Sequence, residues 1–146
     1  MALYAIGDFH LSFTVNKPMD VFGSEWKNHV KKIEKYWNKY IKESDTAVIT
    51  GDHSWGHNLE ECREDLEFIE RLPGRKILLR GNHDMFWDAK KTGKLNELFE
   101  GRLSFLQNNF YAYDDYALVG TKGYCYEGKD SYEHFEKIRD RELVRL

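Results

Sequence analysis

Three short apolar runs, separated by amphipathic segments, restrict the fold of this chain more than any other feature. The runs are Leu3–Ile6, Ala47–Ile49 and Ile77–Leu79. They predict buried β-strands over Leu3–Ile6, Thr46–Thr50 and Lys76–Leu79. The apolar residues between the runs recur at helical spacing: Trp26, Val30, Ile33, Trp37 and Ile41, then Leu59, Cys62, Leu66 and Ile69. This β-α-β-α-β order predicts an α/β domain with parallel strands and right-handed crossovers.

Several residues mark where the predicted helices begin and end. Ser24 is a favourable N-cap for the first helix, and Ser44–Asp45 ends it. Asn58, followed three residues later by Glu61, predicts a capping box at the start of the second helix. Pro73–Gly74 then turns the chain into the third strand.

The remainder of the chain has a different pattern. A short helix is expected at Leu95–Phe99, and Phe110–Tyr113 with Tyr116–Val119 predicts a β-hairpin. Residues 120–129 are expected to form a loop, and a last helix is expected from Asp130 to Leu146. We find no internal repeat and no interdomain linker, so residues 1–146 are expected to form one domain.

The composition favours a cytoplasmic protein with no membrane partner. The chain has neither an apolar stretch long enough to span a bilayer nor a signal-peptide pattern at Met1–Leu3. Its two cysteines, Cys62 and Cys125, argue against a disulfide framework and fit a reducing compartment. A net charge of −3 gives no general attraction to nucleic acid, which is therefore not favoured as a partner. The oligomeric state stays open.

A polar cluster directly follows each predicted strand. The clusters are Asp8-Phe9-His10, Gly51-Asp52-His53 and Gly81-Asn82-His83-Asp84. Residues just past the carboxyl ends of parallel strands meet in one crevice, so these side chains are expected to lie together. Carboxylate, imidazole and amide groups bind divalent first-row metals. We therefore predict Asp8, His10, Asp52 and Asn82 as ligands of two ions (manganese, iron, zinc or nickel, with manganese favoured).

This donor set points to phosphoester hydrolysis. Two ions about 3.5–4 Å apart can share a bridging hydroxide that attacks phosphorus in line with the leaving oxygen. Asp52 can present one carboxylate oxygen to each ion. His83 is the expected general acid for the leaving group, and Asp84 is expected to orient its imidazole and raise its pKa.

With these motifs the chain resembles the calcineurin-like metallophosphoesterase superfamily. The Asp-x-His, Gly-Asp and Gly-Asn-His-Asp elements occur in the family's order, each after a strand. The likeness is greatest to a bacterial branch of predicted phosphoesterases, and it rests on Ser54-Trp55, Leu72–Lys76 and Phe105–Tyr111. The resemblance implies a two-metal hydrolase, such as a phosphatase, with an α/β/β/α sandwich whose N-terminal part is the β-α-β-α-β core and a following hairpin.

The chain departs from the family pattern in its second half. The family completes its site with a lone His after a strand and a Gly-His-x-His element, and only His134 lies beyond the third motif here. The first metal would keep Asp8, His10 and Asp52, and the second only Asp52 and Asn82. We therefore expect the chain to be the N-terminal part of a longer protein. A natural short form with weakly held metals is the alternative, and His53 or His57 could lend an imidazole.

Three functions remain open at this point. The leading hypothesis is a metal-dependent phosphoesterase acting on phosphate mono- or diesters. A nuclease would share the site, and a catalytically incomplete fragment or metal-binding interaction module is the third reading. Among nearby residues, Trp55, Phe86 and Trp87 either line the pocket or pack the loops. Arg80 is more simply a solvated charge at a strand end than a phosphate contact, and His29 and His134 are expected on helix surfaces.

Overall fold

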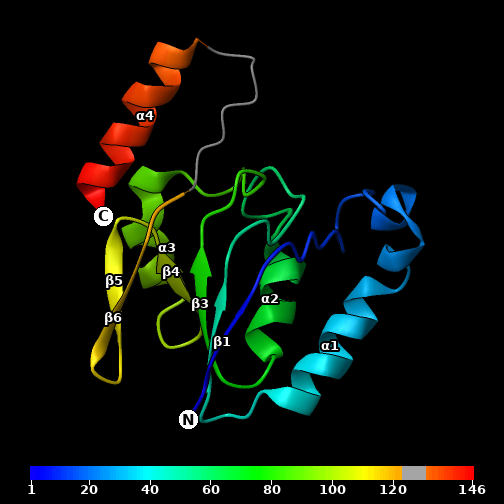
Figure 1. Cartoon of the computed structure of the whole chain (residues 1–146). Helices are drawn as coiled ribbons and strands as arrows, with labels where there is room; N and C mark the ends of the chain where they lie inside the picture. Colours follow the sequence, from blue (N-terminus) through cyan, green and yellow to red (C-terminus); the bar gives the residue numbers. More distant parts are fainter. Residues whose placement is uncertain (123–130) are drawn as a thin grey trace.

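The fold is built on a parallel sheet whose four strands follow one another in space as they do in sequence (Figure 1). In this computed structural model, residues 1–122 and 131–146 are described. The predicted start of the last helix at Asp130 and the residue Cys125 lie outside them. The strands are β1 (Leu3–Ile6), β2 (Thr46–Ile49), β3 (Arg75–Leu79) and β4 (Ser104–Leu106).

Helices cover one face of this sheet. They are α1 (His29–Tyr40), α2 (Arg63–Arg71) and α3 (Thr92–Leu98), with short 3-10 turns at Met19–Phe22, Ser24–Trp26 and Ala89–Lys91. Each helix connects one strand to the next in the same direction across the sheet. Right-handed crossovers of this kind place all the connecting helices on the same face. The predicted α/β core is therefore confirmed.

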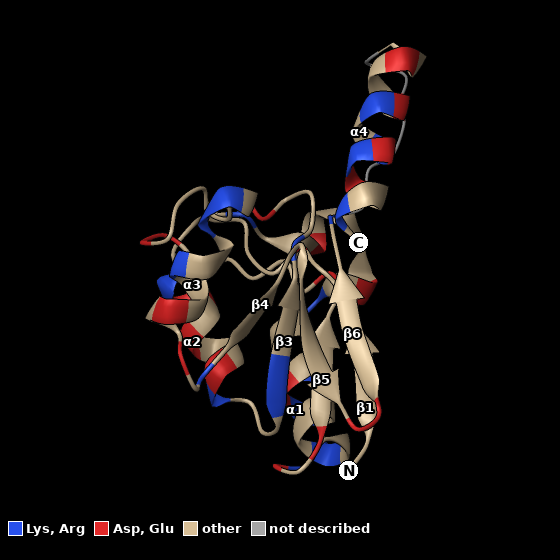
Figure 2. Ribbon diagram, turned by 90° about the vertical axis from the view of Figure 1, so that its left-hand side faces the viewer, with Lys and Arg blue, Asp and Glu red and all other residues tan. Residues whose placement is uncertain are grey.

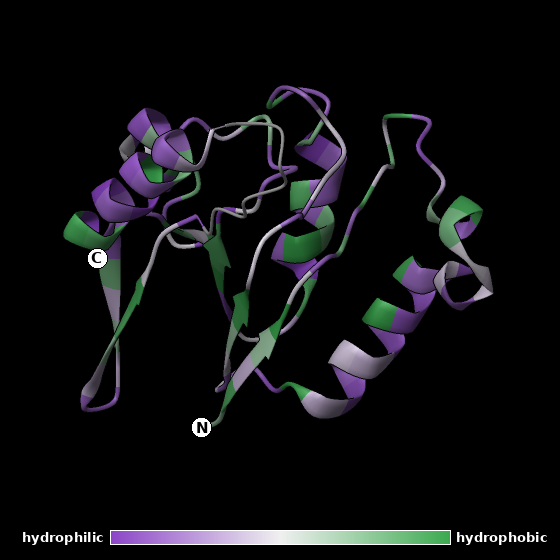
Figure 3. Ribbon diagram, turned by 45° about the horizontal axis from the view of Figure 1, so that its top comes forward, coloured by the Kyte–Doolittle hydropathy of each residue, from purple (hydrophilic) through white to green (hydrophobic). Residues whose placement is uncertain are grey.

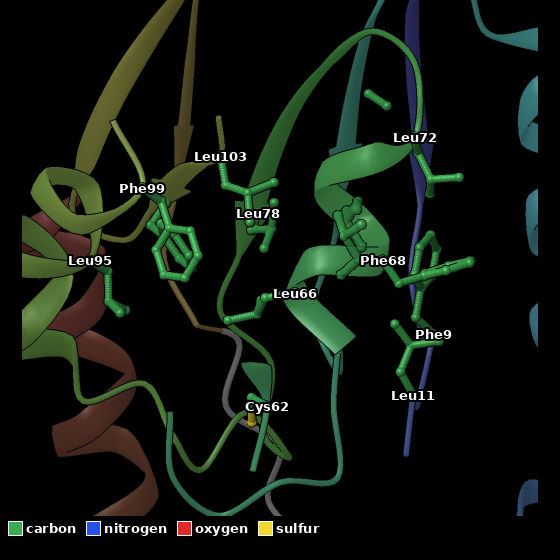
Figure 4. Packing of buried hydrophobic residues seen from close by; sticks show 14 of the residues in the cluster. Phe9, Leu11, Cys62, Leu66, Phe68, Leu72, Leu78, Leu95, Phe99 and Leu103 are labelled. Carbon is green, nitrogen blue, oxygen red and sulfur yellow. The ribbon is translucent and has the colours of Figure 1, made fainter. Parts of the chain in front are cut away.

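The main hydrophobic core lies between the helices and the sheet. Leu78 of β3 and Phe105 of β4 point into it and are fully buried. Figure 4 shows Leu66 and Phe68 of α2 in the same cluster. In Figure 3 the strands are among the most hydrophobic segments of the chain. Successive side chains of a strand point to opposite faces of the sheet, so burial of these positions fixes which side chains of each strand face the helices.

The opposite face of β3 and β4 is covered by an antiparallel hairpin. Its strands are β5 (Asn109–Tyr113) and β6 (Tyr116–Gly120), as the sequence predicts. A Cβ at Gly120 would lie 2.6 Å from Leu79 and 3.2 Å from Leu106, so the end of β6 packs closely on the ends of β3 and β4. The arrangement of helices, parallel sheet and hairpin agrees with the predicted fold class.

The last helix, α4 (Tyr132–Arg145), lies on the side of the molecule toward which the parallel strands run (Figure 1). Ser131 caps it by accepting a hydrogen bond from the backbone N–H of His134. Within the described segments, no helix has the length and apolar character needed to cross a membrane.

Two helix starts and one strand are among the differences from the sequence prediction. The first helix begins at His29 and not after Ser24, because Asn28 takes a left-handed conformation that interrupts the helical path. The Glu61 N–H donates to Oδ1 of Asn58 as a capping box predicts, but the Glu61 carboxylate accepts from the side-chain amide of Asn58, and α2 begins only at Arg63. The fourth strand, β4, was not predicted, since three residues are too few to show a period.

The loops after β1, β2 and β3 are joined through the backbone. The N–H of Asp8 donates to the carbonyl of Gly51, and that of His10 donates to the carbonyl of Asp52. Gly51 has φ +115°, and a Cβ there would lie 2.7 Å from the Cα of Gly81. Glycine is therefore required where the second and third loops touch.

We predict that Gly51→Ala lowers the free energy of unfolding by about 2–4 kcal/mol, because it adds both a disfavoured φ and a backbone clash. Urea denaturation measures this change. Gly101→Ala is the matched control, since Gly101 also has positive φ but its Cβ would meet no atom within 4 Å. A cost for Gly51→Ala no larger than that for Gly101→Ala would contradict the close approach of the loops.

Candidate metal centre

The structure brings Asp8, His10 and Asp52 together at the carboxyl ends of β1 and β2. The Nε2 atom of His10 lies 3.4 Å from Oδ1 of Asp8 and 3.8 Å from Oδ2 of Asp52. One donor atom from each of the three residues falls within 4.8 Å of the other two. Two carboxylates and one imidazole at these separations can bind a single divalent cation.

The backbone at all three residues is unusual. Asp8, His10 and Asp52 have φ of +58°, +44° and +55°, in the left-handed region that side chains rarely adopt. Aspartate and histidine tolerate this region better than most residues, but each position still carries a conformational cost. The left-handed turns redirect the chain just past each strand, and they aim the three side chains at one point.

His10 is buried, and its surroundings favour the neutral imidazole that binds metals. Burial lowers the pKa of His10, and this effect outweighs the nearby charges of Asp52 and Asp8, which act to raise it. The ring of Trp55 stacks on the imidazole, with ring centroids 4.9 Å apart. Trp55 thus lies against the site, whereas Phe86 and Trp87 are part of the hydrophobic core.

The third loop reaches the site through Asp52. The backbone N–H of His83 donates to Oδ1 of Asp52 over 2.9 Å. A Cβ at Gly81 would lie 2.1 Å from that same oxygen. Asn82 stands between these two residues with an exposed side chain, so it lies beside Asp52 and is open to solvent.

The imidazole of His83 lies at the edge of the cluster. Its ring centroid is 4.7 Å from that of Trp55 and 5.6 Å from that of His10. The side chain is half-buried, which leaves one side accessible to a substrate. Asp84 was predicted to orient this imidazole, and here the structure differs.

Asp84 holds His53 and the loop backbones instead of His83. Its carboxylate accepts hydrogen bonds from the N–H groups of Gly81, Asp52 and His53, and from Nδ1 of His53. The prediction was wrong because a buried carboxylate turns toward the nearest N–H donors, and adjacency in sequence does not place two side chains together. Burial disfavours the charged form of Asp84, yet the His53 imidazole and the N–H donors outweigh it and hold its pKa at about 2.

The other histidines have separate roles. His53 is fully buried, and its partner is Asp84. His57 is exposed and lies 3.4 Å from Glu61. Neither belongs to the group formed by Asp8, His10 and Asp52. His134 is exposed on α4, as expected.

His29 was predicted on a helix surface, and here the structure differs. It is half-buried at the first position of α1, and its Nε2 donates a hydrogen bond to the carbonyl of Phe9 over 3.1 Å. This contact ties α1 to the Asp8–His10 loop. Helical spacing alone gave no sign of it, since the partner is a backbone atom twenty residues away.

Comparison with known proteins identifies the family. The chain matches the calcineurin-like phosphoesterase family over residues 1–145. It belongs to this family. The ordered Asp-x-His, Gly-Asp and Gly-Asn-His-Asp elements are thus those of a calcineurin-like phosphoesterase.

Two relatives extend the comparison of this phosphoesterase. An uncharacterised protein from Methanocaldococcus jannaschii is 26% identical over 99 residues, which are 64% of this chain and 53% of that protein. The chain thus spans about half the length of this curated relative. A protein of unknown function from Aquifex aeolicus has a similar solved fold, with a TM-score of 0.55 and 23% identity over 99% of this chain and 74% of that one.

We predict that Asp84→Asn destabilises the metal-free phosphoesterase by about 2–4 kcal/mol at pH 7, since buried donors lose their charged acceptor. A carboxyl whose pKa falls from 3.8 to about 2 on folding contributes stability above pH 4 that disappears as the pH approaches 2. The variant should therefore lose less stability than the parent, by about 2 kcal/mol, as the pH falls from 6 to 2.

The measurement is urea unfolding in the presence of a chelator at several pH values. Asp115→Asn, in the exposed turn of the hairpin, is the control and should follow the parent. Identical pH profiles for the parent and Asp84→Asn would contradict this role of Asp84.

Proposed function

We propose that this protein hydrolyses phosphate mono- or diesters with two bound divalent ions, of which manganese is favoured. The observation that carries the proposal is the convergence of Asp8, His10 and Asp52 donor atoms within 4.8 Å of one another. Membership of the calcineurin-like phosphoesterase family supports the same reaction class.

The chain offers more ligands to the first proposed ion than to the second. Asp8, His10 and Asp52 would hold the first ion through two carboxylates and a neutral imidazole. The second ion would be held by Asp52 and by the amide oxygen of Asn82. His53 and His57 stand outside the cluster, so neither is proposed as a replacement ligand.

Bound divalent ions would supply a strong nucleophile from water at neutral pH and would neutralise charge on the phosphoryl oxygens. The residues of the chain would hold the ions and the substrate in place. Both the side chain and the backbone of Asp52 are fixed. Its carboxylate accepts a hydrogen bond from the His83 N–H, and its own N–H donates one to the Asp84 carboxylate. Its Oδ2 stays directed toward His10.

His83 is proposed as the general acid. Its backbone is anchored to Asp52, and its imidazole packs against Trp55 at the open edge of the cluster. A protonated His83 would give its proton to the leaving alkoxide or phenoxide oxygen. Asp84 is proposed as a positioning residue, because it holds the loops and does not contact the His83 ring.

A cytoplasmic location is proposed on the cysteine content alone. Cys62 is a fully buried thiol in the core, and burial raises its pKa to about 12. It therefore stays protonated and unreactive.

We predict that Asp52→Asn weakens manganese binding by about tenfold or more and abolishes manganese-dependent hydrolysis of 4-nitrophenyl phosphate, because Asp52 is shared by both ion sites. Calorimetric titration measures the affinity, and nitrophenolate release measures turnover. The control is Asp115→Asn, which should bind and turn over as the parent does. Metal binding by the parent without any turnover would favour the interaction-module reading.

We further predict that His83→Gln lowers kcat by about 10²–10⁴-fold while the manganese affinity changes little, since His83 supplies a proton and no metal ligand. His134→Gln, on the exposed side of α4, is the control and should leave kcat unchanged. The loss should be smaller for an ester whose leaving group is more acidic. An equal loss for all leaving groups would argue against general acid catalysis.

A further inference from the structure

A cavity lies between the strand ends and α4. Its volume is about 150 Å³, and its polar lining consists of Arg80, Gln107, Lys122, Arg141, Glu142 and Arg145. Four of these side chains are basic and one is acidic. This cavity is lined by none of the proposed metal ligands.

The cavity is a product of the topology. Arg80 directly follows β3, Gln107 directly follows β4, and Lys122 comes two residues after β6. Because the end of β6 packs on the ends of β3 and β4, the three side chains meet. The buried Gln107 fixes the arrangement, since it accepts a hydrogen bond from the Lys122 N–H and donates one to Thr121.

The acidic residue of the cavity is already neutralised. Glu142 is buried and lies 3.0 Å from Arg145 and 2.9 Å from Arg141. It also accepts a hydrogen bond from the Thr121 hydroxyl. Figure 2 shows the alternating charges along α4. The direct contacts of Glu142 are therefore with Arg141, Arg145 and Thr121, and its charge acts on Lys122 only from a distance.

Within the described part of the chain, Arg80 and Lys122 form no ion pair with a carboxylate. Neither has a carboxylate within salt-bridge distance among residues 1–122 and 131–146, and Nε of Arg80 is buried with no hydrogen-bond partner there. Burial, followed by the charge of Arg80, lowers the pKa of Lys122, and the charges of Asp52, Asp84 and Glu142 offset only part of this effect. Two half-buried like charges are unfavourable unless an anion joins them.

The cavity also adjoins the metal centre. Arg80 immediately precedes the Gly81–Asp84 loop, and the charges of Asp52 and Asp84 act on Lys122. An anion held by Arg80 and Lys122 would thus lie at the same edge of the sheet as the proposed ions. A guanidinium fork and an ammonium together suit the tetrahedral oxygens of phosphate.

We propose that Arg80 and Lys122 form a phosphate-binding subsite next to the metal centre, which takes a second phosphate of the substrate. The assignment of this phosphate to the substrate rests on the proposed phosphoesterase function. It narrows the substrate class to small phosphoesters that carry another phosphate group. It also revises the interpretation of Arg80 as a solvated strand-end charge.

The first test measures the binding of inorganic phosphate to the whole chain by calorimetry, in the presence of a chelator. Arg80→Gln and Lys122→Gln should each weaken phosphate binding by about tenfold, as expected for the loss of one charge-assisted contact. Lys137→Gln, on the exposed side of the same helix α4, is the matched control and should bind as the parent does. Asp52→Asn should retain binding.

Because this readout needs neither metal nor turnover, it stands even if the proposed hydrolysis fails. Absence of phosphate binding in the parent, or parent-like affinity in folded Lys122→Gln, would overturn the subsite. Arg80→Lys provides a second variant that keeps the charge, with a smaller expected loss than Arg80→Gln. Thermal unfolding checks that each variant is folded.

The second test separates a substrate phosphate from free phosphate. With manganese present, Lys122→Gln should raise KM for 1,4-butanediol bisphosphate by about tenfold and leave KM for butyl phosphate nearly unchanged. Equal KM changes for both esters, with phosphate binding still sensitive to Lys122→Gln, would show that the subsite serves free phosphate and would overturn the substrate assignment.

Discussion

The carboxylate of Asp84 is the contact on which the rest of the site depends. It lies in the interior, where an unpaired charge would be strongly unfavourable, and it is satisfied by donors from both the second and the third loop. It therefore fixes the backbone of Asp52, and the N–H of His83 in turn fixes the Asp52 carboxylate. One buried anion thus sets the position of the residue that both proposed ions would share.

This arrangement has a conformational and an electrostatic cost. Asp8, His10 and Asp52 all adopt left-handed φ, which costs about 1–2 kcal/mol per residue in general, somewhat less for aspartate. The hydrogen bonds from Asp8 and His10 to the second loop offset part of this cost. The two carboxylates beside one imidazole repel each other until a cation binds, so metal binding and folding stability are thermodynamically linked.

The sequence predicted the parts of the structure that follow from local pattern. The strands, the hairpin and the meeting of the three motifs at one edge were predictable, because strand periodicity and parallel topology determine them. The hydrogen-bond partners of the loop residues could not be predicted in this way. Asp84 turned to His53, and His29 bonded to the carbonyl of Phe9, for reasons that depend on distances between loops. The three-residue β4 and the late start of α1 after Asn28 likewise depend on tertiary packing and a single backbone dihedral.

The position of α4 follows from polar contacts more than from apolar ones. Its apolar residues near the C-terminus, Leu143 and Val144, are exposed, and Glu142 is its only buried residue. In Figure 3 most of α4 is hydrophilic, with a hydrophobic end. An anion in the adjacent cavity would compete with Glu142 if it bound Arg141 or Arg145, and would thereby weaken the contact that holds the helix. Binding to Arg80 and Lys122 avoids this competition, because these two cations come from the strand ends and do not pair with Glu142.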